Sequence, residues 1–107
     1  METIHPRLDV THAQIERFCQ KWKITRLELF GSILRDDFDE QSDVDVLATF
    51  DADARLSLFK LVQMEDDLRG LLGREVDLVE RRSIEENPNW IRRNAILSSA
   101  RLLYEAA

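Results

Sequence analysis

A glycine-serine turn and a pair of alternating aspartates constrain this chain more than any other feature. Gly31 and Ser32 follow an apolar segment. Asp43 and Asp45 then open a second apolar segment, residues 43–50. Side chains alternate between the two faces of a strand, so these two carboxylates share one face. Carboxylates held side by side repel each other, and a folded protein usually compensates them with a cation. The sequence therefore predicts a cation site in the segment that follows a tight turn.

The turn itself has a composition that suits a phosphate group. Gly31 permits a tight turn or a close approach of the backbone, and Ser32 is a good N-cap for a short helix over residues 33–36. The free N–H groups at a helix N-terminus just after a strand attract anions. Arg35, one turn further on, can neutralise another phosphate oxygen. We interpret this stretch as the binding site of a nucleoside triphosphate.

Asp77 supplies a third carboxylate, on a short strand predicted at residues 75–79. It lies among apolar neighbours, which is an unusual position for a carboxylate unless something binds it. Oxygen ligands select hard cations, so Mg²⁺ is the expected metal. Two such ions would hold the triphosphate and lower the pKa of an attacking hydroxyl. Asp43 and Asp45 are the expected metal ligands, and Asp77 would complete the second metal site and help to accept the hydroxyl proton.

Periodicity and capping signals predict the remaining elements. Thr11 and Gln14 have the form of a capping box that opens a helix running to about Lys23. The predicted strands are residues 26–30, 43–50 and 75–79, the predicted helices are residues 55–72 and one that Pro88 starts at its first position, and residues 101–104 fit either type. Gly73 should cap the long helix in a left-handed conformation.

Several conspicuous residues are expected to be structural. Cys19 lies on the apolar stripe of the first helix and should be core. The Arg81-Arg82 pair falls in a charged connection, residues 80–86, and should be solvated. The inner face of the long helix is expected to contain Leu58, Leu61, Val62, Glu65, Leu68 and Leu72, with Glu65 as its polar interruption.

Alternative interpretations of the acidic stretch are weaker or stay open. An EF-hand loop that starts at Asp37, Asp39 or Asp43 has neither glycine at its sixth position nor glutamate at its twelfth. The two histidines lie near the N-terminus without a nucleophile motif, so a Ser-His-Asp arrangement is not supported. A solvated strand face without any ligand remains the alternative.

Composition limits the class of protein and its partners. A chain of 107 residues has the usual size of one domain, here residues 1–107. A single cysteine fits a reducing compartment, and the chain has no long apolar run and no signal pattern. The net charge of −6 disfavours direct contact with nucleic acid. We expect a cytoplasmic protein that binds neither membranes nor nucleic acid.

The residues described above resemble the minimal nucleotidyltransferase family, a small branch of the DNA polymerase beta-like nucleotidyltransferase superfamily. The matching positions are Leu29-Phe30-Gly31-Ser32, Arg35, Ser42-Asp43-Val44-Asp45-Val46-Leu47, Val76-Asp77-Leu78-Val79 and Leu103-Tyr104-Glu105. The resemblance implies an α/β fold with a small mixed sheet and helices packed on one side. It also implies Mg²⁺-dependent transfer of AMP from ATP, with Gly31, Ser32, Arg35 and Ser42 in contact with the nucleotide.

The same resemblance implies a biological partner. Many members of the family are antitoxins that adenylylate a HEPN-domain ribonuclease toxin, at a tyrosine in the studied type. The chain is too short to carry an acceptor domain of its own, so we expect the toxin to present the acceptor and to form a hetero-oligomer with the chain. Two alternatives remain: neutralisation of the toxin by binding alone, and transfer to a small molecule such as an aminoglycoside.

Overall fold

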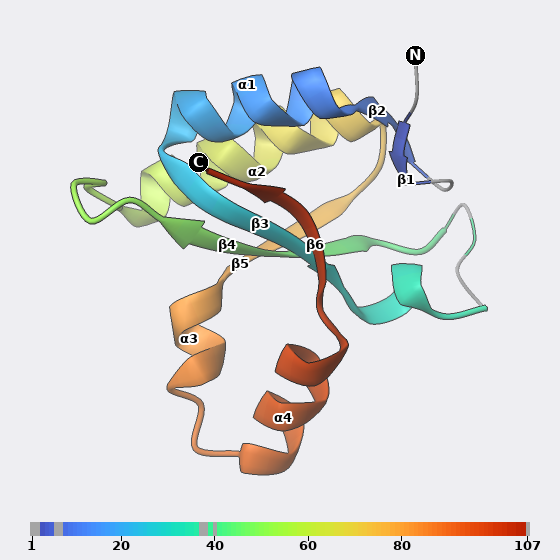
Figure 1. The fold of residues 1–107 in the computed structure, drawn as a ribbon, viewed down its shortest axis with the longest axis vertical. Coiled ribbons are helices and arrows are strands. Elements are labelled where there is room, and N and C mark those ends of the chain that lie inside the picture. The colour runs from blue at the N-terminus through green and yellow to red at the C-terminus, as the bar shows by residue number, and fades with distance from the viewer. Residues whose placement is uncertain (1–2, 6–7, 37–38, 40, 107) are drawn as a thin grey trace.

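The computed structural model describes residues 3–5, 8–36, 39 and 41–106. In chain order they form β1 (Thr3–His5), β2 (Leu8–Thr11), α1 (His12–Trp22), β3 (Ile24–Phe30), the short 3₁₀ helix η1 (Gly31–Leu34), β4 (Val44–Phe50), α2 (Leu58–Leu72), β5 (Val76–Glu80), α3 (Arg81–Glu85), α4 (Trp90–Ser99) and β6 (Arg101–Glu105). Figure 1 shows these elements along the chain.

Four strands form a mixed sheet in the order β5-β4-β3-β6. β4 runs parallel to β5, whereas β3 is antiparallel to both β4 and β6. The segment that the sequence leaves undecided is therefore a strand, because it pairs with β3 along the edge of the sheet. A separate hairpin of β1 and β2 was not predicted from the sequence. The predicted α/β fold class is confirmed.

The two long helices cover one face of the sheet (Figure 1). On this face the alternate residues Val44, Val46 and Ala48 of β4 are fully buried, in agreement with the predicted alternation. Thr11 and Gln14 form the predicted capping box of α1, and Gly73 ends α2 in the left-handed conformation. The two predicted helix boundaries that depend on local chemistry are thus confirmed.

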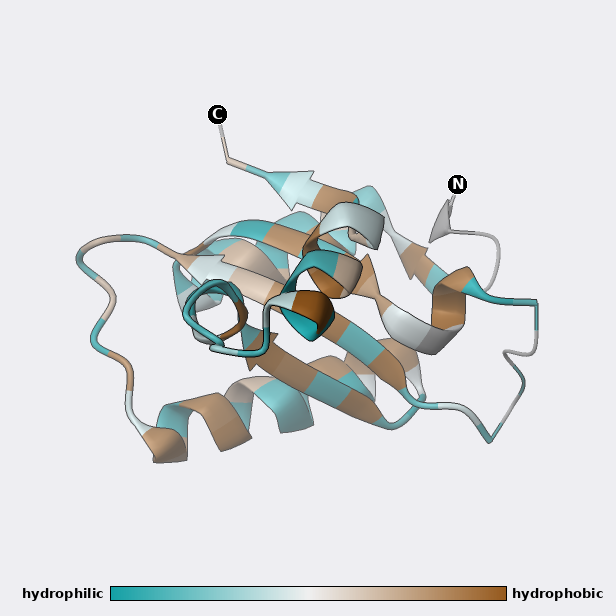
Figure 2. Cartoon of the chain, turned by 90° about the horizontal axis from the view of Figure 1, so that it is seen from below, coloured by the Kyte–Doolittle hydropathy of each residue, from teal (hydrophilic) through white to brown (hydrophobic). Residues whose placement is uncertain are grey.

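The shorter helices α3 and α4 pack on the opposite face, which corrects the expectation that all helices lie on one side. Figure 2 views the sheet from this side, with both helices in front of the strands. Phe30 and Leu47 project from the sheet here and form a second apolar cluster with Ile84 of α3, against which Ile96 and Leu97 of α4 pack. Helix α3 was not predicted because residues 80–86 are mostly charged and Ile84 is the single buried apolar residue of the helix.

Two other helix predictions differ from the structure. The buried row of α2 is Met64, Leu68 and Leu72, whereas Leu58 and Val62 are exposed. Successive helical residues are about 100° apart around the axis, so a small error in the predicted face moves a side chain from core to solvent. α4 begins at Trp90 behind an Asn89 N-cap, and Pro88 lies before the helix and not at its first position.

Glu65 lies on the inner side of α2, where it bonds to the edge of the sheet. One oxygen of its carboxylate accepts the backbone N–H of Leu78 at 3.0 Å, and the other pairs with Arg69 at 2.8 Å. β5 is an edge strand, so this N–H has no neighbouring strand to bind on its outer side. The polar interruption of the helix therefore satisfies a backbone donor of the sheet edge.

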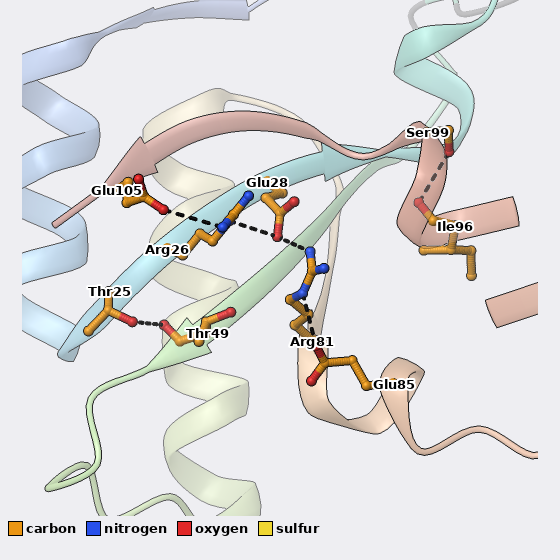
Figure 3. Close-up of polar contacts among 9 residues, drawn as sticks. All are labelled: Thr25, Arg26, Glu28, Thr49, Arg81, Glu85, Ile96, Ser99 and Glu105. Atoms are coloured by element: carbon orange, nitrogen blue, oxygen red, sulfur yellow. Dashed lines mark hydrogen bonds and ion pairs between the residues drawn. The ribbon is translucent and has the colours of Figure 1, made fainter. Parts of the chain in front are cut away.

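A buried ion pair connects α3 to the centre of the sheet (Figure 3). The Glu28 side chain is only 4% exposed, and its Oε1 lies 2.5 Å from Nη1 of Arg81 and 3.4 Å from Nε of Arg26. Burial acts to lower the pKa of the Arg81 guanidinium, but the hydrogen bond and charge of Glu28 outweigh burial and raise that pKa. Arg81 is thus a structural ion-pair partner, contrary to the expectation of a solvated residue.

Replacing Arg81 by alanine should destabilise the fold strongly. The buried carboxylate of Glu28 would keep only its longer contact with Arg26, so we expect a loss of about 2 to 3 kcal/mol in the free energy of unfolding, measured by urea denaturation. The control is Arg82→Ala, because among the described residues that exposed side chain pairs with Glu86 alone, at 3.1 Å, and its loss should cost less than about 0.5 kcal/mol. Equal losses for the two variants would contradict this role of Arg81.

Cys19 should be inert in the folded protein. Its side chain is fully buried, and burial raises the pKa of its thiol to about 12. The thiolate is the reactive form, so iodoacetamide at about pH 8.5, near the pKa of a free thiol, should label the chain only in concentrated guanidinium chloride. Labelling of the native chain at the rate of the unfolded chain would show that the thiol is accessible.

Candidate active site

The two halves of the sequence motif meet where β3 ends. Phe30, the last residue of β3, pairs with Asp45 of β4, so the following residue, Gly31, lies against the Asp45 side chain. Gly31 has a φ of +75°, and a Cβ at this position would clash with Oδ2 of Asp45. Both the left-handed backbone and the close carboxylate require glycine here. The turn and the second aspartate therefore form one compact unit.

Asp77 lies beside Asp45 across the parallel pair of strands. The register places Asp45 of β4 opposite Asp77 of β5, and residues in register on neighbouring strands share a face of the sheet. Asp45 is half-buried, whereas Asp77 is exposed. Asp77 is therefore more accessible than its apolar sequence neighbours suggest, and solvent can reach the side chain.

Asp43 precedes β4 at the end of an anchored loop. The N–H of Val44 donates to the carbonyl of Glu75 at 2.9 Å, which fixes the start of the strand. Arg74 donates to the backbone carbonyls of Asp39 and Ser42, the latter at 3.2 Å. Arg74 thus anchors the loop that ends at Asp43. No pattern in the sequence indicated this structural role.

The other predicted site residues divide into two groups. Gly31 and Arg35 line a cavity described below. Ser42 forms hydrogen bonds with Asp39, since its hydroxyl donates to Oδ1 at 3.2 Å and accepts the Asp39 N–H at 3.1 Å. Ser32 belongs to η1, and its side chain lies outside the described part of the structure. Nucleotide contacts by Ser32 and Ser42 stay predictions.

The carboxylates suit magnesium through their chemistry. Among the described residues, no group of three or more acidic, histidine or cysteine side chains is close enough to hold a metal ion. Mg²⁺ commonly uses only one or two carboxylates together with substrate phosphates and water. Asp45 and Asp77, opposite each other in the register, match that pattern of oxygen donors. The roles of Asp43, Asp45 and Asp77 as metal ligands stay predictions.

A cavity of about 560 Å³ lies between η1 and α4, beside this unit. Phe30, Leu34 and Ile96 contribute apolar walls, and Arg35 and Arg92 contribute positive charge. Gly31 borders the cavity and also lies against the Asp45 side chain, so this carboxylate is near the cavity without lining it. Small-molecule sites usually measure roughly 300–1,000 Å³ and combine apolar walls with a few polar groups. The cavity has the size and lining of a ligand site.

A second hollow, of about 670 Å³, lies at the other end of β4, against Thr49 and Phe50. Arginine and glutamate side chains of β5 and α3 line it. The lining residues that the structure describes there include none of the predicted site residues. The cavity beside Gly31 is thus the one that contains predicted site residues, although the other hollow is larger.

Comparison with known proteins identifies the family to which these features correspond. Residues 13–103 match the family model of the nucleotidyltransferase domain. The candidate protein adenylyltransferase MJ1217 of Methanocaldococcus jannaschii is 34% identical over 82% of this chain and 87% of its own length. The protein adenylyltransferase MntA of Thermococcus cleftensis is 32% identical over 79% of this chain and 84% of its own.

Solved structures share the fold. A toxin-antitoxin crystal structure with AMP-PNP superimposes with a TM-score of 0.68 at 21% identity, over 91% of this chain and 75% of that chain. The complex of the tri-AMPylated Shewanella oneidensis HEPN toxin with an MNT antitoxin gives a TM-score of 0.60 at 21% identity, over 89% and 70% of the two chains.

No helix in the described ranges is long and apolar enough to cross a membrane.

Gly31→Ala should impair the site more than the fold. A methyl group would displace the Asp45 carboxylate, so we expect binding of ATP with Mg²⁺, measured by calorimetry, to weaken by about tenfold or more. The matched control is Gly73→Ala, where φ is +67° and an added Cβ meets nothing within 4 Å. Both variants should lose about 1 kcal/mol of stability from the left-handed backbone. Unchanged ATP binding by Gly31→Ala would show that the Gly31–Asp45 contact is not part of the site.

Proposed function

The chain belongs to the nucleotidyltransferase domain family, and from this premise we propose that it transfers AMP from ATP to a hydroxyl group of a partner protein. The observation that carries the proposal is the contact between Gly31 and Asp45, with Asp77 beside it and the cavity alongside. This arrangement offers carboxylates for a metal and a glycine turn and cations for phosphates. The names of the relatives, which are protein adenylyltransferases, support the same chemistry.

In this proposal the nucleotide occupies the cavity with its phosphates toward Gly31. The backbone at Gly31 and Ser32 donates to phosphate oxygens, and Arg35 neutralises part of their charge. The apolar walls formed by Phe30 and Ile96 accept the less polar part of the nucleotide. The toxin-antitoxin crystal structure with AMP-PNP, which shares this fold, supports the proposal that a nucleotide binds here.

Asp45 and Asp77, which lie opposite each other in the register, would each contribute oxygens to bound Mg²⁺, and Asp43 would be the third carboxylate of a site with two ions once the nucleotide is bound. When bound, the metal neutralises phosphate charge and lowers the pKa of the attacking hydroxyl. The acceptor oxygen bonds to the α-phosphorus, the bond to the bridging oxygen breaks, and pyrophosphate leaves. Asp77, which is exposed on the same face as Asp45, accepts the hydroxyl proton. Catalysis then depends mainly on positioning and charge stabilisation.

The acceptor is proposed to be a tyrosine of a HEPN ribonuclease toxin, which the chain neutralises as its antitoxin. The neighbouring complex of an AMPylated HEPN toxin with an MNT antitoxin supports this partner. Trp90 and Ile91 at the start of α4 are 61% and 65% exposed, and exposed apolar groups of this size suit contact with a protein. They are the two residues before Arg92, which lines the cavity.

The transfer should be visible with labelled ATP. Incubation of the chain with Mg²⁺, the toxin from the neighbouring gene and ATP labelled at the α-phosphate should label the toxin, whereas ATP labelled at the γ-phosphate should not. Asp43→Asn and Asp45→Asn should each reduce labelling by about a hundredfold or more, because removal of a group that stabilises transition-state charge costs that much. The control is Asp9→Asn, an exposed aspartate on β2.

Three outcomes would contradict this function. Labelling that survives both substitutions would separate the transfer from these carboxylates. Full protection of cells from the toxin by the Asp43→Asn, Asp45→Asn double variant, with no modified toxin, would favour neutralisation by binding alone. Labelling of an aminoglycoside in place of the toxin would redirect the proposal to a small acceptor.

A further inference from the structure

Arg92 brings an unexpected positive charge to the cavity beside Gly31. It lies in the first turn of α4, where its backbone N–H donates to the side chain of the Asn89 N-cap at 3.2 Å. Its side chain lines the cavity together with Arg35, which follows η1. Two elements from distant parts of the chain thus place guanidinium groups on the walls of one cavity.

The neighbouring arginines on this side of the sheet already have partners. Arg81 pairs with Glu28 and Glu85, and Arg82 pairs with Glu86. Arg93 donates to the carbonyl of Asn87 at 3.1 Å. By contrast, the Arg92 guanidinium makes no hydrogen bond or ion pair within the described ranges of the chain. No described residue therefore occupies its five N–H donors, which suit the oxygens of an anionic ligand.

The charges of the cavity wall favour a polyanion. Arg35 and Arg92 are its charged lining residues among those described, and no carboxylate joins them. This is unusual for a chain of net charge −6. An anion that enters the cavity is attracted by the charges of both guanidinium groups. A guanidinium also matches the paired oxygens of a phosphate in bidentate geometry.

We propose that Arg92 binds the β- or γ-phosphate of the nucleotide from the side opposite Arg35. This assignment rests on the proposed function, because it places the same ATP in the same cavity. The α-phosphate lies toward Asp45, so the outer phosphates extend between η1 and α4. α4 then becomes part of the nucleotide site and distinguishes a triphosphate from a monophosphate.

The assignment makes a specific prediction for nucleotide length. Calorimetry on the full chain with Mg²⁺ would compare ATP, AMP and inorganic tripolyphosphate. Arg92→Ala and Arg92→Gln should weaken ATP and tripolyphosphate by about tenfold or more, since a charged hydrogen bond is lost, and should change AMP by less than about twofold. The control is Arg101→Ala, which removes the same charge from an exposed position on β6. Circular dichroism would verify that each variant is folded.

Each result decides the assignment. Equal ATP binding by the wild-type chain and both Arg92 variants would overturn it and leave the proposed function intact. Equal weakening of ATP and AMP would also overturn it, because Arg92 would then contact the nucleoside. A wild-type chain that binds no ATP would overturn the proposed function and the assignment together. A loss confined to ligands with a β-phosphate, and absent in Arg101→Ala, would support it.

Discussion

The antiparallel pairing of β3 with β4 is the constraint on which the rest of the structure depends. These are the two central strands, so each outer strand is positioned by one of them. The same register places Phe30 opposite Asp45 and Glu28 opposite Leu47. One alternation of side chains therefore directs Val44 and Val46 toward the long helices and Asp45 and Leu47 toward the short ones. A shift of one residue would exchange the two faces and abolish both cores and the site together.

Different physical interactions position the residues of the candidate site: sterics, strand register, apolar packing and an ion pair. Sterics at Gly31 allow the Asp45 carboxylate to contact the turn, and the parallel register adds Asp77. Apolar packing of Ile84, Ile96 and Leu97 holds the short helices under the sheet, which brings Arg92 to the cavity. The ion pair between Arg81 and Glu28 reinforces that packing. The Asp45 carboxylate and the cavity lined by Arg35 and Arg92 thus meet at Gly31.

Local chemistry made much of this arrangement predictable. The Gly31 turn, the alternating aspartates, the capping box and the Gly73 cap depend on residues close in sequence, and each of these patterns is typical of one local structure. Arg74, Arg81 and Arg92 act across the fold, and the sequence alone does not reveal which charge each one will meet. α3 was missed because charged residues surround its single buried side chain, Ile84. The fold class and the acidic positions were therefore accessible, whereas the arginine contacts required the tertiary structure.

The bond between Glu65 and the backbone of Leu78 also has a consequence for self-association. An open strand edge is a template on which another chain can add a strand and begin aggregation. On β5 the helix places a carboxylate over that edge, so an incoming strand would meet a negative charge and an N–H that is already bonded. Glu65 therefore protects one border of the sheet from growth. Its position on the inner side of α2 serves solubility as well as the stability of the single chain.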